Sequence, residues 1–280
     1  MRRIGGHVSV AGGLETAIRK TQLITGNCMQ IFAASPRSWR RTVYSSSECE
    51  EFAQAVKQLD LQPVFIHASY LINLASDKPE LIEKSLDSLR SDLRLAEDIG
   101  AAGVVVHLGS FQKRSFDQTK QQVADLLRQL TKPLKQTRLL MENMSGQQGK
   151  IGAIEHLQWL YHQLNSDRLG ICLDTAHLWA AGYCLGQPGE VDRLVDKLKQ
   201  AGLFEAVQLI HLNDSKAECG SHRDLHENIG QGQIGGSGLK QMINQPEFDA
   251  LPLILEVPGF GNKHKGVDKR NIMLAKQLVK

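Results

Sequence analysis

The sequence predicts a (β/α)8 barrel formed by residues 1–280 as a single domain. Eight short apolar runs alternate with longer amphipathic stretches from one end of the chain to the other, as strands and helices alternate in such a barrel. Several runs are apolar at nearly every position, which is typical of parallel strands buried on both faces. The 280 residues fit the roughly 250 that this fold needs, and no break in composition marks a second domain.

The strands and helices can be placed in chain order. The eight predicted strands are residues 4–10, 28–33, 63–67, 103–107, 139–143, 169–174, 207–212 and 253–257. Helical periodicity is clearest at residues 80–99, 116–130 and 190–201. Ser47 followed by Glu50 predicts a capping box, and Pro188-Gly189 predicts the start of the helix at residue 190. An open doubly wound sheet alternates in the same way, but the count of eight strands favours the closed barrel.

Composition and cysteine usage indicate a cytoplasmic protein. The net charge of +3 does not by itself predict a nucleic-acid binder, although a local basic patch would be enough for one. No apolar run approaches the roughly 18 residues of a membrane helix, and the first strand follows Met1-Arg2-Arg3 without room for a signal peptide. The five cysteines form no C-x-x-C pair, so we expect reduced thiols at Cys28, Cys49, Cys172, Cys184 and Cys219.

Six consecutive strands carry a histidine or a carboxylate at or near their C-terminal end. These residues are His67, His107, Glu142, Asp174, His211 and Glu256. In a barrel the C-terminal ends of the strands converge on one face, where active sites lie. A polar residue at the barrel rim would account for any one of them alone, but not for six in register. Because histidine with carboxylate is the ligand mixture of zinc and related ions, the sequence predicts a metal site at this face.

Three further residues extend this set. Residues 213–238, between the seventh and eighth strands, are rich in His, Asp and Gly, and a loop this long is usually functional. Asp224 and His226 lie two positions apart in it, and His177 follows Asp174 by three. Together they would hold one more ion, which makes nine candidate ligands for three ions. Three divalent ions outweigh the four carboxylates, so we expect an anionic substrate such as a phosphodiester.

Eight short motifs, spread in order over residues 3–278, resemble those of the endonuclease IV family of apurinic/apyrimidinic (abasic-site) DNA repair nucleases. The motifs are Gly6-His7-Val8-Ser9, Ser35-Pro36-Arg37-Ser38-Trp39, His67-Ala68-Ser69-Tyr70-Leu71-Ile72-Asn73-Leu74, Val106-His107-Leu108-Gly109-Ser110, Glu142-Asn143, Asp174-Thr175-Ala176-His177, His211-Leu212-Asn213-Asp214-Ser215-Lys216 and Leu255-Glu256. All nine metal-ligand positions of the family are filled.

The resemblance implies three zinc ions per chain, with manganese as an alternative at one position. The implied ligands are His67 and His107 for the first ion, Asp174, His211 and Glu256 for the second, Glu142 as a bridge between these two, and His177, Asp224 and His226 for the third. The implied reaction is hydrolysis of the phosphodiester 5′ to an abasic site by metal-bound hydroxide, which leaves a 3′-hydroxyl and a 5′-deoxyribose phosphate. Family members also trim blocked 3′ ends.

The resemblance also implies how double-stranded DNA with an abasic site is held. Arg37, Tyr70 and Leu71 match residues that the family inserts into the base stack. Further candidates for phosphate contacts are Arg2, Arg3, Arg40, Arg41, Lys216, Lys263 and Lys265. Gly230-Gln231-Gly232-Gln233-Ile234-Gly235 follows no apolar strand, so we expect a flexible loop near DNA and not a nucleotide cofactor site. We expect a monomer that associates with the nucleoid when on DNA, with no membrane partner.

Three positions depart from the family pattern, and two other functions remain open. The loop after Glu142 has its second glycine displaced to Gly149, Val257 stands where threonine is common, and Ala33-Ala34 replaces a common lysine. The first alternative is a metal-dependent sugar isomerase or epimerase, which would share Glu142, Asp174, His211 and Glu256. The second is a barrel that binds damaged DNA or metal without catalysis. His7 is expected to support the ligands, and His156, His162, His222 and His264 are expected to be structural.

Overall fold

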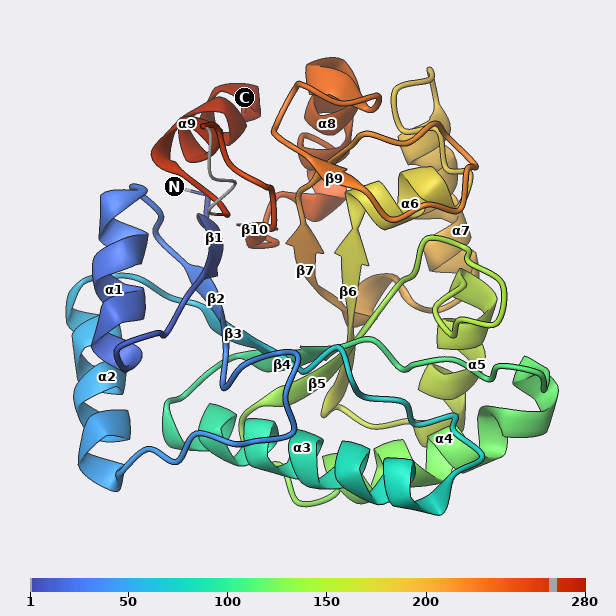
Figure 1. Ribbon diagram of the computed structural model, residues 1–280. Coiled ribbons are helices and arrows are strands. Elements are labelled where there is room, and N and C mark those ends of the chain that lie inside the picture. The colour runs from blue at the N-terminus through green and yellow to red at the C-terminus, as the bar shows by residue number, and fades with distance from the viewer. Residues whose placement is uncertain (1, 262–265) are drawn as a thin grey trace.

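The computed structural model describes residues 2–261 and 266–280, and its eight parallel strands close into a barrel (Figure 1). The strands follow one another around the barrel in the order β1-β10-β7-β6-β5-β4-β3-β2. Their bounds are β1 Ile4–Val8, β2 Met29–Phe32, β3 Val64–His67, β4 Gly103–Val106, β5 Arg138–Glu142, β6 Leu169–Asp174, β7 Val207–His211 and β10 Leu253–Leu255. The predicted barrel is therefore confirmed, and each predicted strand overlaps an observed one.

The helices form a ring outside the strands (Figure 1). They are α1 Leu14–Leu23, α2 Ser46–Gln58, α3 Pro79–Asp98, α4 Phe116–Thr131, α5 Ile154–Leu164, α6 Thr175–Ala180, α7 Glu190–Gln200, α8 Gly235–Ile243 and α9 Lys269–Leu278, with short 3-10 turns at Phe204–Ala206 and Pro246–Phe248. The three predicted helices correspond to α3, α4 and α7. Apolar side chains between this ring and the strands form the larger of two buried clusters.

The capping box of α2 lies two residues before its predicted position. Ser45 accepts a hydrogen bond from the backbone N–H of Glu48, and the Glu48 carboxylate accepts one from the backbone N–H of Ser45. Ser47 and Glu50 have the same spacing, but Ser47 already lies within the helix. The prediction was wrong because Ser45 and Ser47 both stand three residues before a glutamate. The cap at Ser45 makes the helix about half a turn longer at its start and leaves its buried face unchanged.

The inside of the barrel contains a single apolar layer beneath its C-terminal end. The layer consists of Cys28, Phe65, Val105, Leu140, Cys172, Leu209 and Ile254. Side chains two positions apart on a strand point to the same face, so residue i+2 on each strand also points into the barrel. These next positions are Gln30, His67, His107, Glu142, Asp174, His211 and Glu256, and β1 contributes His7 in the same way. The strand geometry thus places eight polar side chains in one ring above the apolar layer.

The stretch after β7 is more regular than the sequence indicated. β8 Asp214–Ser215 and β9 His226–Glu227 form a two-stranded antiparallel sheet, in which Ser215 is opposite His226. The buried Asp214 carboxylate accepts hydrogen bonds from the backbone N–H groups of Ser215, Gly232, Ile234 and Gly235. A Cβ atom on Gly232 would lie 2.4 Å from the carbonyl oxygen of Ser215. The glycine-rich segment is therefore packed around Asp214, where we had expected a flexible loop.

The prediction of five reduced cysteines is wrong for two of them. Cys184 and Cys219 form a disulfide, whereas Cys28, Cys49 and Cys172 are free and buried. The two partners are 35 residues apart in sequence and no motif links them, so only the packing of their loops brings them together. The cysteines therefore no longer support a reducing compartment. None of the described helices is long and apolar enough to span a membrane.

Candidate metal centre

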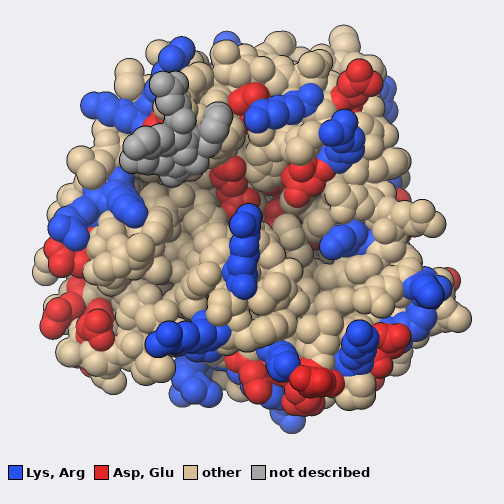
Figure 2. All heavy atoms as spheres, viewed as in Figure 1, with Lys and Arg blue, Asp and Glu red and all other residues tan. Residues whose placement is uncertain are grey.

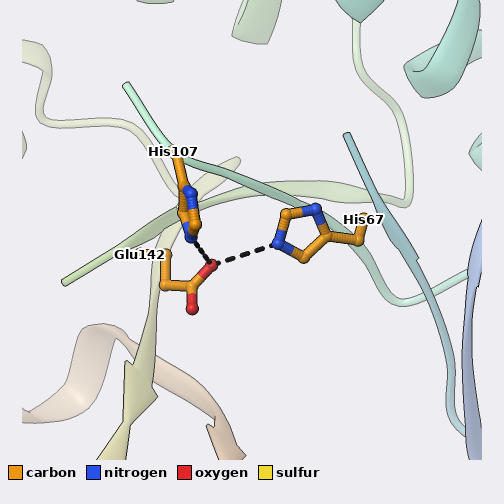
Figure 3. A group of neighbouring side chains, drawn as sticks. All are labelled: His67, His107 and Glu142. Carbon is orange, nitrogen blue, oxygen red and sulfur yellow. Dashed lines mark hydrogen bonds and ion pairs between the residues drawn. The ribbon is translucent and has the colours of Figure 1, made fainter. Parts of the chain in front are cut away.

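Glu142 lies at the middle of the polar ring and is completely buried. Its Oε2 atom lies 2.7 Å from Nε2 of His107 and 3.3 Å from Nε2 of His67, and both rings point toward this carboxylate (Figure 3). Its Oε1 atom lies 3.1 Å from Nδ1 of His211 and 3.4 Å from Nδ1 of His177. The two oxygens of one carboxylate thus face different groups: Oε2 faces His67 and His107, and Oε1 faces Nδ1 of His211, whereas Nδ1 of His177 also contacts the carbonyl oxygen of Asn143.

A second group of ligand atoms adjoins Glu142 on the other side of the ring. Glu142, Asp174, His211 and Glu256 each offer an atom within 4.8 Å of the others. Nδ1 of His211 lies 3.4 Å from Oε2 of Glu256 and 3.9 Å from Oδ2 of Asp174. Cys172 belongs to the apolar layer beneath the ring, and its Sγ atom lies within 4.8 Å of ligand atoms of Glu142 and His211. The sequence pattern did not predict this contact.

The third predicted group meets where α6 approaches β9. His177 comes from α6, His226 from β9, and Asp224 from the loop just before β9. The Asp224 carboxylate lies between the two imidazoles, 3.1 Å from Nε2 of His177 and 3.2 Å from Nε2 of His226. Asp174 is 3.6 Å from Nε2 of His226 and so joins this group to the second one. All nine predicted ligand positions therefore lie in one continuous cluster.

The orientation of the histidines fits divalent metal ions. Four of these histidines donate one ring N–H to a fixed acceptor and turn the other ring nitrogen toward the cluster. The four hydrogen bonds are His67 Nδ1 to Ala68 O (2.8 Å), His177 Nδ1 to Asn143 O (2.9 Å), His226 Nδ1 to Glu256 O (3.1 Å) and His211 Nε2 to Gln30 Oε1 (2.9 Å). Metal-binding histidines are held in this way. The Nε2 atoms of His107, His177 and His226 are buried, and each lies 2.7–3.2 Å from a carboxylate oxygen of the cluster. None of these contacts has hydrogen-bond geometry among the described residues, which fits nitrogen and oxygen atoms that share an ion.

The carboxylates and imidazoles of the cluster shift one another's pKa values. Burial raises the pKa of Glu142, but the imidazoles of His107 and His211 outweigh this effect and hold its pKa well below its usual range. Burial lowers the pKa of His226, but Asp174 and Asp224 outweigh it and raise the pKa to about 9. Carboxylate and imidazole thus stabilise each other's charged forms in this buried place.

Three buried amides orient the ligands and were not predicted from the sequence. Gln30 donates to Oε1 of Glu256 (2.6 Å) and accepts from His211. The Asn213 side chain donates to Oδ2 of Asp174 (2.6 Å) and accepts from the backbone N–H of Glu256 (2.8 Å). Asn143 accepts from the backbone N–H of Asp174 (2.7 Å). Gln30 could have been found from its strand position, because it lies two residues after the buried Cys28.

His7 completes the ring on β1, as expected. Its Nδ1 atom lies 2.7 Å from Oε1 of Glu256 and 3.0 Å from Nε2 of Gln30. Of the other histidines, His162 donates to the carbonyl oxygen of Ala201 outside the barrel, and His222 contacts the carbonyl oxygen of Ser145. His264 lies outside the described residues.

The predicted DNA-inserting residues lie on two loops that are joined to each other beside the ring. The carbonyl oxygen of Pro36 accepts hydrogen bonds from the Ser69 hydroxyl (2.8 Å) and from the backbone N–H of Tyr70 (3.2 Å). Arg37 is exposed, Leu71 is half-buried, and Tyr70 is 52% exposed although its ring centroid lies 5.6 Å from that of His67. A hollow of about 770 Å³ adjoins this loop and the ring at His7.

Some of the predicted phosphate contacts do not lie near this face. Arg2 and Arg3 precede β1, so they belong to the opposite end of the barrel, where Arg2 donates to the carbonyl oxygen of Phe248 and Arg3 pairs with Asp60. Arg41 pairs with the buried Asp92 on α3. Arg40 and Lys216 are exposed, while Lys263 and Lys265 lie outside the described residues. In the space-filling view, acidic side chains are visible in the central hollow, with Lys and Arg side chains around it (Figure 2).

Comparison with known proteins agrees with this geometry. Residues 25–276 match the family model described as xylose isomerase-like TIM barrel. The chain is 35% identical to the probable endonuclease 4 of Sulfurihydrogenibium sp. over the full length of both chains, and 38% identical to that of Haloarcula marismortui over 92% of this chain and 93% of the relative. The chain belongs to the endonuclease IV family.

Solved structures support membership of the endonuclease IV family and separate it from other barrels. The crystal structure of endonuclease IV from Thermus thermophilus has a TM-score of 0.85 and 36% identity, and the match covers 99% of this chain and 98% of that one. A D-tagatose 3-epimerase-like protein has a TM-score of 0.70 but only 17% identity, over 99% of this chain and 95% of that one. The likeness to the epimerase is one of fold alone.

Proposed function

We propose that the protein is a zinc-dependent apurinic/apyrimidinic endonuclease that acts on double-stranded DNA. It hydrolyses the phosphodiester 5′ to an abasic site, leaves a 3′-hydroxyl and a 5′-deoxyribose phosphate, and trims blocked 3′ ends. The observation that carries this proposal is the continuous cluster around Glu142, in which all nine ligand positions approach one another. Relatives named probable endonuclease 4 that match the full chain support the same reaction.

The cluster would hold three ions. His67, His107 and Glu142 would bind the first, and Glu142 would be shared with Asp174, His211 and Glu256 around the second. His177, Asp224 and His226 would bind the third. The nitrogen and oxygen donors favour zinc, with manganese as an alternative at one position. Ions in this place supply the charge that stabilises a phosphate and lower the pKa of water.

The protein's own groups hold this chemistry in position. Glu142 is buried among four imidazoles and keeps its negative charge, so it neutralises two cationic groups at once. Gln30, Asn143 and Asn213 fix the ligand orientations through buried hydrogen bonds. Because six of the nine ligands come from strand ends of a closed barrel, the rigid scaffold holds this part of the cluster in place.

Arg37, Tyr70 and Leu71 would insert into the base stack beside the abasic nucleotide. The nucleotide must leave the stack before its phosphate reaches buried ligands such as Glu142. Tyr70 supports this role because about half of its surface is exposed while its ring lies beside His67 at the edge of the ligand ring. We propose that one barrel acts as a monomer, in the cytoplasm and on the nucleoid.

A nicking assay on duplex DNA with one abasic site tests this function. We expect cleavage on the 5′ side, no cleavage of undamaged duplex, and about three divalent ions per chain by elemental analysis. Asp224→Asn should lose one ion and most activity, whereas Asp87→Asn, on the exposed side of α3, should change neither. Absence of nicking by fully metallated protein would refute the proposal.

The same preparation should be tested on free ketoses. The isomerase alternative keeps only Glu142, Asp174, His211 and Glu256, and it gives no role to the group around Asp224. Epimerase activity without nicking would favour that alternative, and stable DNA binding without either activity would favour a non-catalytic barrel.

A further inference from the structure

The third group of ligands is assembled from two segments that the barrel strands do not hold together. His177 belongs to α6, while Asp224 belongs to residues 216–225, the loop between β8 and β9 (here called the ligand loop). His226 follows immediately on β9, a strand of two residues. The pairing of β8 with β9 fixes the end of the loop next to Asp224, where Lys216 N donates to Leu225 O (2.8 Å). The distance between Asp224 and His177 depends in addition on how the ligand loop is fastened to α6.

The Cys184–Cys219 disulfide fastens these two segments covalently. Cys184 lies four residues after the end of α6, and Cys219 lies in the ligand loop, five residues before Asp224. Three hydrogen bonds join the same segments: Gly220 N to Trp179 O (3.0 Å), His222 N to Ala180 O (2.9 Å) and Trp179 Nε1 to Ala217 O (2.9 Å). The bond is the covalent member of a small interface between α6 and the ligand loop.

The disulfide is accessible, in contrast to the three free thiols. Cys184 and Cys219 are half-buried and their neighbours Gly182, Gly186 and Gly220 are exposed. Cys28 and Cys172 are completely buried, and Cys49 is buried on α2. A reagent in solution should therefore reach the disulfide in the folded protein and leave the buried thiols unmodified.

We propose that Cys184 and Cys219 are positioning residues for the third ion, and that the redox state of this pair controls how firmly the ion is held. With the bond formed, Asp224 and His226 are held against His177. With the bond broken, the ligand loop has more conformational entropy, and part of this entropy is lost again when the ion binds. The proposal rests on the metal assignment of the proposed function, and it extends that assignment to regulation.

Reduction should act on this ion and spare the other two. Each of the remaining ligands is the last residue of a barrel strand, like Glu142, or the residue directly after one, like His107, and none is in the ligand loop. A tertiary phosphine breaks the S–S bond to give two thiols, and becomes a phosphine oxide with oxygen from water. A phosphine is preferred because a dithiol reductant would itself bind zinc. If binding of the ion to the reduced protein must order about one more residue of the loop, the affinity for the third ion should fall about tenfold.

The test measures metal release from zinc-loaded protein to a chromophoric chelator, before and after phosphine treatment. We expect one of three ions to leave about tenfold faster after reduction, and the slow rate to return on reoxidation with a low-molecular-weight disulfide. The double variant Cys184→Ser/Cys219→Ser should match the reduced protein and be insensitive to phosphine, which excludes zinc binding by the new thiols. Equal release from oxidised, reduced and variant proteins would overturn the proposal.

A second measurement separates this inference from the metal assignment. Amide hydrogen exchange of metal-free protein should show faster exchange at Gly220 and His222 after reduction, because their hydrogen bonds to α6 lose covalent support. Unchanged exchange would refute the positioning role whatever the metal content. Faster exchange in a protein that binds no zinc would instead keep the fastening role and refute the proposed metal centre.

Discussion

Replacement of Gln30 by methionine should weaken the metal centre without touching a ligand. Gln30 is completely buried, and its amide joins two proposed ligands of the second ion. Its Nε2 atom donates to Glu256 at 2.6 Å, and its Oε1 atom accepts from His211 at 2.9 Å. Gln30→Met keeps the length of the side chain and removes both hydrogen bonds, so the change tests orientation rather than packing.

The size of the effect follows from these two contacts. A hydrogen bond to a charged group contributes about 1.5–3 kcal/mol, and one between neutral groups about 0.5–1.5 kcal/mol. Loss of both leaves the buried N–H of His211 unpaired and Oε1 of Glu256 with His7 as its remaining partner. The free energy of unfolding of the metal-free protein should therefore fall by about 2–4 kcal/mol. Removing the partner of a metal-binding histidine typically costs 10–100-fold in metal affinity or activity.

The assay combines denaturant unfolding, zinc content after dialysis against a chelator, and nicking of abasic duplex. The control is Thr21→Val on α1, which also removes a completely buried hydrogen bond, from the hydroxyl to Ala17 O, but lies outside the barrel. The control should lose about 1 kcal/mol of stability and keep its zinc and its activity. If Gln30→Met is destabilised like the control but keeps full zinc and nicking activity, the orienting role is wrong.

Three further changes test the centre and its surroundings. Glu142→Gln should reduce nicking by several orders of magnitude in a folded protein, because an amide cannot balance two cations; wild-type turnover would remove Glu142 from the reaction. Tyr70→Ala with Leu71→Ala should weaken binding to abasic duplex about thirtyfold for a wedge worth about 2 kcal/mol, with zinc content unchanged, and equal binding in a fluorescence titration would contradict this. Burial raises the pKa of Asp92 to about 7 although Arg41 acts against this shift, so between pH 4 and 7 this carboxyl is mostly protonated in the folded protein while it ionises in the unfolded chain. Wild-type stability should therefore lose up to about 4 kcal/mol relative to Asp92→Asn between pH 4 and 7, and parallel stability curves would show that the pKa is not raised.

The sequence could predict the barrel and the six polar residues that meet at its strand ends because both depend on a strict period. A parallel strand buried on both faces is apolar by necessity, and the first polar residue at its end stands out. The same period explains why Gln30 was missed: an uncharged amide at a strand end carries no metal chemistry of its own. Only the position two residues after Cys28 and the observed contact with Glu256 reveal its role.

Features that depend on how loops pack could not be predicted in this way. The partners Cys184 and Cys219 belong to two loops whose contact is decided by α6 and β8, so their spacing in sequence contains no signal. Arg2 was taken for a phosphate contact on its charge alone, although a residue that precedes the first strand must lie at the opposite end of the barrel from the ligands. A positive charge therefore indicates a phosphate contact only when the residue is known to lie at the same end of the barrel as the ligands.

The carbonyl oxygen of Pro36 has a consequence for how the enzyme can be altered. Because it accepts hydrogen bonds from both Ser69 and Tyr70, a backbone shift on the loop of Arg37 is transmitted to the loop of Tyr70. Substitutions on the two loops should therefore show epistasis, with effects in double-mutant cycles that do not add. Libraries that vary these loops should randomise both together, since variants selected on one loop would not combine freely with those selected on the other.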